Sequence, residues 1–224
     1  LVTIAKGTTW DFSGKILNTS SASGGHVING GTMKFDDKSD LTEVAQGSID
    51  NHAGVIETTA ANLGDDTAGL TLGLNAKSGT NVDVGTIVVT DNLGATDIDW
   101  AATTTGTLDL RADQTSTGYI LAEKVTLNVN GTGANTFEGT IKVAAIGGTG
   151  TASFKGGVDV DDLAVGGERS YSGNVTAKNG ITLGTNDTAG TIVLDGANLT
   201  TKTIANADLT NKSVGTVRVE NSAK

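Results

Sequence analysis

The 224-residue chain contains no cysteine and no proline, and only 4% of its residues are aromatic. No disulfide can therefore form. An average chain of this length carries about 11 prolines, so turns must here be made by Gly, Asn, Asp and Ser. So few aromatic rings favour a thin, elongated core of Val, Ile, Leu, Ala and Thr over a thick globular one.

Long apolar runs and clusters of basic residues are also missing. A membrane-spanning helix needs about eighteen apolar residues, and the longest candidate, from Ile141 to Ile146, is interrupted by Lys142. The sequence therefore predicts no membrane insertion. The formal net charge is −10, and the 15 basic residues are scattered. Nucleic-acid binding requires clustered Lys and Arg, so we expect no nucleic-acid partner.

Glycine is abundant, with 32 residues, and it recurs in one pattern. The pattern is Gly-Thr, an apolar residue, any residue, and a second apolar residue. The copies begin at Gly31, Gly85, Gly106, Gly139, Gly190 and Gly215, with a looser copy at Gly150. Apolar residues two apart share one face of a strand. Each copy therefore predicts a glycine turn followed by a short strand.

The pattern predicts an all-β fold of repetitive short strands with almost no helix. Two architectures fit it. The strands form a parallel β-solenoid, or they form one or two antiparallel β-sandwiches whose hairpins are closed by the dipeptides Asn29-Gly30, Asn130-Gly131, Asn179-Gly180 and Asp195-Gly196. The unequal spacing of the Gly-Thr copies argues against an even repeat.

No linker divides the chain, so we predict one continuous domain over residues 1–224. A weak duplication of two halves is the alternative, because residues 63–69 resemble residues 183–190. The chain begins at Leu1 within a strand-like pattern, which we interpret as a mature product or a piece of a longer protein.

The sequence offers few candidates for catalysis. Its two histidines, His26 and His52, lie in Gly- and Asn-bounded loops, and the chain has no Gly-x-Ser-x-Gly elbow. Nucleotide-binding glycine loops and the His-Glu-x-x-His zinc motif are also missing. We therefore expect no enzyme, no nucleotide cofactor and no catalytic zinc.

Carboxylates are the one dense chemical group. Asp159 and Asp161 alternate with Val160, so both carboxylates would share a strand face and could offer hard oxygens to calcium. We name this pair as the candidate metal site. The alternative is that such charges solvate the surface and keep sheet edges from pairing indiscriminately. A glycosidase with two carboxylates in an acidic cleft is a further alternative, but the sequence selects no pair.

The Gly-Thr pattern, the Asn-Gly turns and the lack of cysteine resemble the passenger region of bacterial autotransporter adhesins and related surface-layer proteins. This resemblance implies coils of a parallel β-helix, displayed on the outer surface for adhesion or coating. The lack of cysteine also suits a chain that crosses an oxidising compartment unfolded. Both observations predict an extracellular, cell-surface location.

Strand-like sequence at both ends suggests how such a protein would act. Val2 and Ile4 at one end, and Val217 and Val219 at the other, would lie on open strand edges that invite another subunit. We therefore expect a non-catalytic structural protein that assembles with itself into a filament or surface layer. The alternatives are an adhesin fragment that binds host or surface glycans, and a polysaccharide-degrading β-helix enzyme.

Overall fold

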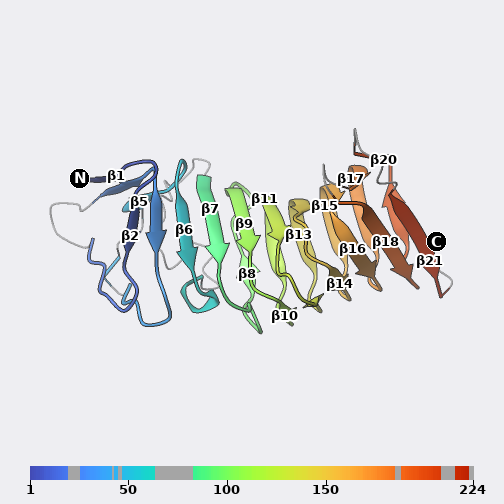
Figure 1. The fold of residues 1–224 in the computed structure, drawn as a ribbon, viewed down its shortest axis with the longest axis horizontal. Helices are drawn as coiled ribbons and strands as arrows, with labels where there is room; N and C mark the ends of the chain where they lie inside the picture. The colour runs from blue at the N-terminus through green and yellow to red at the C-terminus, as the bar shows by residue number, and fades with distance from the viewer. Residues whose placement is uncertain are drawn as a thin grey trace.

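The computed structural model describes residues 1–19, 26–41, 43–44, 47–63, 83–184, 188–207 and 215–221. They form a parallel β-solenoid of about nine turns, which we call coils. Figure 1 shows a rod along which the chain advances from the N-terminal end to the C-terminal end. Every pairing between the described strands is parallel.

The described strands belong to three sheets. A three-stranded sheet contains β1 (Val2–Ile4), β3 (Val27–Asn29) and β5 (Ile49–Asp50). A twelve-stranded sheet contains β2 (Thr9–Asp11), β4 (Thr32–Lys34), β6 (Val55–Thr58), β7 (Asp83–Val89), β8 (Ile98–Asp99), β9 (Thr105–Leu110), β11 (Ile120–Val129), β13 (Ile141–Gly147), β15 (Val158–Val165), β17 (Val175–Leu183), β19 (Leu199–Thr201) and β20 (Ile204–Asn206). A six-stranded sheet contains β10 (Thr115–Ser116), β12 (Asn135–Phe137), β14 (Ala152–Phe154), β16 (Gly167–Tyr171), β18 (Gly190–Asp195) and β21 (Thr216–Glu220).

The longer strands of the twelve-stranded sheet turn a corner of the rod. In β11, Ile120 and Leu121 pair with β8, whereas residues 124–129 pair with β9 of the same neighbouring coil. A central coil therefore has three sides, two from the twelve-stranded sheet and one from the six-stranded sheet. This arrangement encloses a narrow interior, which small and medium apolar side chains are able to fill.

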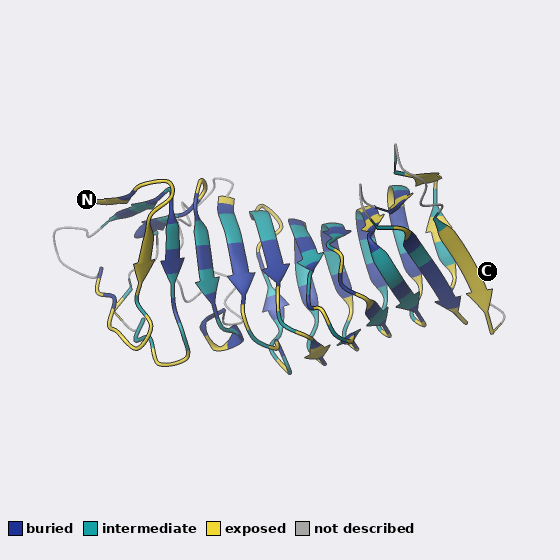
Figure 2. Cartoon of the chain, in the orientation of Figure 1, coloured by how far each residue is buried: buried dark blue, intermediate teal, exposed yellow. Residues whose placement is uncertain are grey.

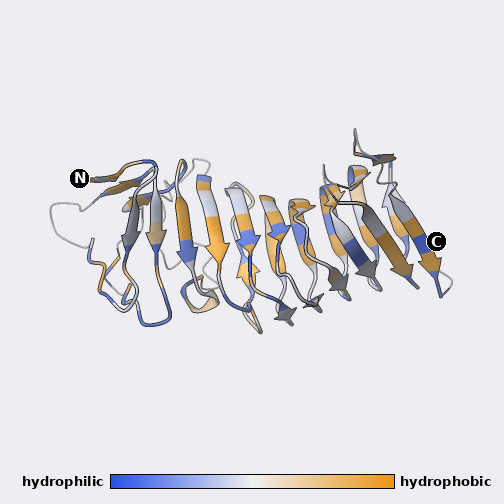
Figure 3. Cartoon of the chain, in the orientation of Figure 1, coloured by the Kyte–Doolittle hydropathy of each residue, from blue (hydrophilic) through white to orange (hydrophobic). Residues whose placement is uncertain are grey.

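Side chains of successive coils stack into columns that fill the interior, and each coil contributes one side chain to a column. We call the longest of them the interior column. It consists of Trp10, Met33, Ile56, Ile87, Leu108, Leu127, Ile146, Leu163, Ile181 and Ile204. Its members from Met33 to Ile181 are at most 2% exposed. Apolar and polar segments alternate along these strands (Figure 3), as expected when one strand face lines a core.

Glycine stands at the corners because successive backbones approach closely there. Gly85 has a φ of +62°, and a Cβ atom on it would lie 1.9 Å from the carbonyl oxygen of Asn51 in the preceding coil. The Thr residues that follow Gly85 and Gly106 pair with each other. The Gly-Thr copies are therefore corners that lead into in-register strands.

The expectation of an all-β fold is confirmed, and of its two architectures the parallel solenoid is correct. The sandwich is wrong because the tight dipeptides are not hairpins. Asn29-Gly30 joins β3 to β4, which belong to different sheets, and each of these strands pairs with strands of neighbouring coils. Helical structure among the described residues is limited to the 3₁₀ turn Ala60–Asn62. The proposed duplication involves residues 64–69, which lie outside the described residues.

Coil length varies, which explains the unequal spacing of the Gly-Thr copies. Val158 pairs with Val175, 17 residues further on, whereas Val55 pairs with Thr86, 31 residues further on. The strands keep their register while the connecting segments change in length. An uneven sequence repeat is therefore compatible with a continuous stack of coils.

Candidate functional site

The two ends of the rod differ from its middle in exposed apolar surface. Seven large apolar side chains are exposed among the described residues, and all of them lie on terminal segments. They are Leu1, Val2, Trp10 and Ile16 at one end and Ile204, Val217 and Val219 at the other. Figure 2 shows β2 at one end, and β20 and β21 at the other, exposed along their length, while the strands in the middle of the rod are largely buried or half-buried.

Both ends are also open edges of sheets. The order of the twelve-stranded sheet places β2 at one edge, and β19 and β20 beside β17 at the other. β1 lies at the edge of the three-stranded sheet, and β21 at the edge of the six-stranded sheet. An edge strand presents backbone N–H and C=O groups that are able to pair with a further strand.

The N-terminal end contains an apolar pocket of about 150 Å³. Its apolar lining comes from Leu1, Val2, Trp10, Phe12, Leu17 and Val27, and Asn18, Thr19 and His26 complete it. The ring of Phe12 stacks on Phe35 at 5.4 Å between centroids, and Trp10 lies 6.3 Å from Phe12. Three of the eight aromatic rings of the chain thus lie together at this end.

The four residues proposed for assembly lie at these ends. Val2, Val217 and Val219 are 39%, 39% and 58% exposed, whereas Ile4 is 1% exposed and packs in the core. Ile4 therefore lends its backbone to the edge strand β1, not its side chain. Their role in assembly stays a prediction.

Sequence reasoning missed Trp10 and Ile204, which cap the two ends of the interior column. They are 44% and 46% exposed, although every column member between them is buried. The alternation of Thr9-Trp10-Asp11 placed Trp10 on one strand face. Only the register across coils of unequal length shows that Trp10 and Ile204 share a column.

The candidate calcium residues, Asp159 and Asp161, lie together on the outer face of β15, as their alternation predicted. A cation from the chain already lies between them. Nζ of Lys178 is 3.1 Å from Oδ1 of Asp159 and 3.3 Å from Oδ1 of Asp161. The hydrogen bond with Asp159, and then the one with Asp161, raise the pKa of Lys178. Calcium needs six to eight oxygen ligands, so this geometry favours Lys178 as the partner of both carboxylates.

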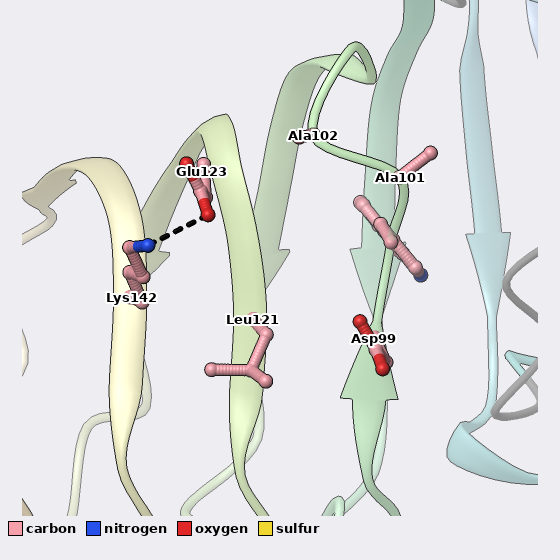
Figure 4. Close-up of a pocket in the computed structure, with 7 residues that line it drawn as sticks. Asp99, Ala101, Ala102, Leu121, Glu123 and Lys142 are labelled. Atoms are coloured by element: carbon pink, nitrogen blue, oxygen red, sulfur yellow. Dashed lines mark hydrogen bonds and ion pairs between the residues drawn. The ribbon is translucent and has the colours of Figure 1, made fainter.

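A second pocket, of about 270 Å³, lies on the side of the rod. It is lined by Asp99, Trp100, Ala101, Ala102, Leu121, Glu123 and Lys142. Figure 4 shows Glu123 and Lys142 joined across neighbouring strands, with 2.7 Å between Oε1 and Nζ. Leu121 turns an apolar side chain outward between Asp99 and Lys142, its partners in register. The pocket therefore combines carboxylates with an apolar floor.

An unexpected charge lies inside the solenoid. Arg169 of β16 is 0% exposed and occupies the register position held by Ala152 and Ile192 in the adjacent coils. Its Nη2 donates to the carbonyl oxygens of Gly147 and Gly148, at 3.1 and 3.0 Å, but Nε and Nη1 have no partner among the described residues. Burial lowers the pKa of this guanidinium.

Tyr171 lies two residues further along the same face and shares the unusual environment of Arg169. Its ring stacks on Phe154, which stacks on Phe137, with 5.1 Å between centroids in both pairs. Its hydroxyl is buried without a partner among the described residues, and burial raises the pKa of that hydroxyl. The alternation of Arg169 and Tyr171 was the signal that could have placed Arg169 in the core.

The histidines form no site with a nucleophile in the described contacts. Nδ1 of His52 lies 2.7 Å from Oδ1 of Asp50, with the His52 side chain 60% exposed. This hydrogen bond raises the pKa of His52. His26 lines the N-terminal pocket.

Within the described parts of the chain, no three His, Cys, Asp or Glu side chains are grouped to hold a metal ion. No helix of those parts has the length and hydropathy needed to cross a membrane. Comparisons with protein-family models, curated proteins and solved structures gave no match.

Proposed function

We propose that this protein is a non-catalytic structural protein of the extracellular surface, which assembles through its strand edges into a filament or layer. The observation that carries this proposal is the concentration of exposed apolar side chains on open sheet edges at the two ends of the rod. The sides of the rod, by contrast, carry polar residues and ion pairs such as Lys142 with Glu123.

Strand addition gives such ends a physical reason to associate. Each added strand satisfies a row of backbone donors and acceptors. Burial of apolar side chains contributes about 25 cal/mol for each Å² removed from water. Neither contribution needs catalytic or metal-binding side chains, which agrees with a chain that has no cysteine and only two histidines.

The extracellular location rests on composition. The chain has no cysteine and a net charge of −10, and it resembles autotransporter passengers and surface-layer proteins in its repeats. A chain without thiols has none to mispair in an oxidising compartment. A long solenoid also separates its two ends, as a stalk or coat must.

The proposal is tested by electron microscopy and sedimentation of the purified chain over a range of concentrations. We expect the native chain to form ordered filaments or sheets. A Val217→Lys, Val219→Lys variant should stay monomeric, because it places two charges on the exposed edge β21. A Thr176→Lys, Thr182→Lys variant adds the same charge to the outer face of β17 and should assemble like the native chain. Isolated particles of the native chain at every concentration would refute the proposal.

The adhesin alternative is favoured by the side pocket around Asp99 and Leu121. Carboxylates that accept hydrogen bonds, beside an apolar floor, suit a saccharide, whose hydroxyls are donors and whose ring faces are apolar. A glycan array separates the two functions. Binding that is abolished by Leu121→Asp, yet retained in the Val217→Lys, Val219→Lys variant, would identify an adhesin.

A further inference from the structure

We infer that the two ends of the solenoid bind each other. The C-terminal edge of one copy stacks on the N-terminal edge of a second copy, with Ile204 placed against Trp10. The inference rests on the proposed assembly and adds its partner, polarity and register. The partner is a second copy of this chain, and the resulting filament is polar.

The interior column ends in an exposed residue at each end of the rod. Trp10 and Ile204 are its two end members, and both are about half exposed while the members between them are buried. When a second copy is stacked on the C-terminal end of the first, Trp10 of the second copy takes the column position that follows Ile204 of the first. The contact buries the exposed side chains of Trp10 and Ile204, and it uses the same packing that neighbouring coils already make within one chain.

The two ends of the rod are complementary, not alike. All described strands pair in parallel, so β2 of a second copy is able to pair in parallel with β20 of the first. Joining two N-terminal ends would instead bring strands together antiparallel and break the register of the columns. A head-to-tail contact that does not close on itself generates an open filament.

The N-terminal end also offers a concave apolar surface to a second copy. Its apolar pocket lies beside the rings of Trp10 and Phe12, and the exposed apolar residues of the C-terminal end lie on the strands that would meet it. Trp in a concave apolar surface is the typical anchor of a protein interface. Each end therefore supplies one part of a single contact.

Cysteine cross-linking tests the inference, because the native chain has no cysteine. Asp11 and Ala205 lie on the outer face beside Trp10 and Ile204, so cross-linking them leaves the apolar contact intact. Paired strands lie about 4.8 Å apart, within the Cα separation that a disulfide accepts. We expect a mixture of Asp11→Cys and Ala205→Cys chains to give oxidised dimers, and a chain with both substitutions to give a ladder of multimers.

A matched control checks the register. Lys34 lies one coil inward from Asp11, so Lys34→Cys should not cross-link to Ala205→Cys. Replacing Trp10 with Ser in the Asp11→Cys chain should lower the dimer yield by about tenfold, as for a truncated Trp anchor. An unchanged yield in that variant would overturn the role of Trp10.

Failure of the inference differs from failure of the proposed function. Dimers of Asp11→Cys with itself would show that like ends meet, and would overturn the inference while assembly stands. Filaments of the native chain without any of these cross-links would mean lateral assembly, with the same consequence. A native chain that stays monomeric and gives no cross-link would overturn both.

Discussion

Nδ2 of Asn29 donates a hydrogen bond to Oδ1 of Asn51, its counterpart in the next coil, at 2.6 Å. Asn51 in turn donates to the carbonyl oxygen of Val84 at 2.7 Å, in the coil beyond. Both asparagines are 1% exposed. A short polar ladder therefore ties three coils together at a corner near the N-terminal end.

Asn51→Ala should destabilise the protein by about 1–3 kcal/mol, because it leaves buried partners without their hydrogen bonds. Urea unfolding monitored by circular dichroism measures the loss. Asn179→Ala is the control, since Asn179 is exposed and makes one long hydrogen bond of 3.3 Å to Asp162. Equal effects of the two substitutions would contradict the ladder.

Phe154→Ala should cost about 3–5 kcal/mol, the usual range for a buried phenylalanine. Phe154 is 0% exposed and lies between Phe137 and Tyr171, so the substitution removes the centre of the aromatic stack. Ser153→Ala, on the opposite face of β14, should change the free energy of unfolding by less than about 0.5 kcal/mol. A loss below about 1 kcal/mol for Phe154→Ala would mean that the stack does not form.

The positions of strands could be predicted from the sequence, but their partners could not. The Gly-Thr copies at Gly31, Gly85 and Gly106 coincide with β4, β7 and β9, because alternation within a strand is a local property. Pairing depends on which residues meet after a connection of variable length. Since coils range from 17 residues, between Val158 and Val175, to 31, between Val55 and Thr86, spacing alone hid the register.

In the candidate sites, too, local alternation predicts which residues share a strand face, but not which residues of other coils they meet. Asp159 and Asp161 share a face because of local alternation, whereas Lys178 reaches them from the next coil. Arg169 carries the most polar of side chains, so composition assigns it to the surface. Its burial follows from the pairing of coils, which sets it in register between Ala152 and Ile192 and brings its guanidinium to the carbonyl oxygens of Gly147 and Gly148.

Tyr171→Phe should raise the free energy of unfolding by about 1–3 kcal/mol at neutral pH, because it removes a buried hydroxyl without a partner.

The stability of the native chain should also depend on pH through Tyr171. Its pKa is raised in the folded state, so the folded chain holds the hydroxyl proton more tightly than the unfolded chain, and this contribution to stability is fully present below the unfolded pKa of about 10. That contribution is lost as the pH rises through the folded pKa. Urea unfolding between pH 8 and pH 11 should therefore show the native chain weakening more than Tyr171→Phe; parallel pH profiles would contradict this.

Calcium should not stabilise the native chain, because Lys178 already pairs with Asp159 and Asp161. Thermal unfolding in about 1 mM Ca²⁺, the range in which weak extracellular calcium modules bind, should match unfolding in a chelator. Lys178→Met should lower stability by no more than about 1 kcal/mol, as for exposed ion pairs. A calcium-dependent rise in melting temperature that disappears in Asp159→Asn, Asp161→Asn would instead establish the metal site.

The parallel pairing of the strands has a mechanical consequence. Backbone hydrogen bonds between neighbouring coils run along the rod, so tension applied to its two ends loads the bonds of all sides of a coil together. A force that peels one end strand, such as β21 from β18, loads its bonds one after another. The rod should therefore resist a pull that is spread over whole end coils, but unravel when one terminal strand is pulled alone. A second copy stacked on that end would hold the terminal strand in place.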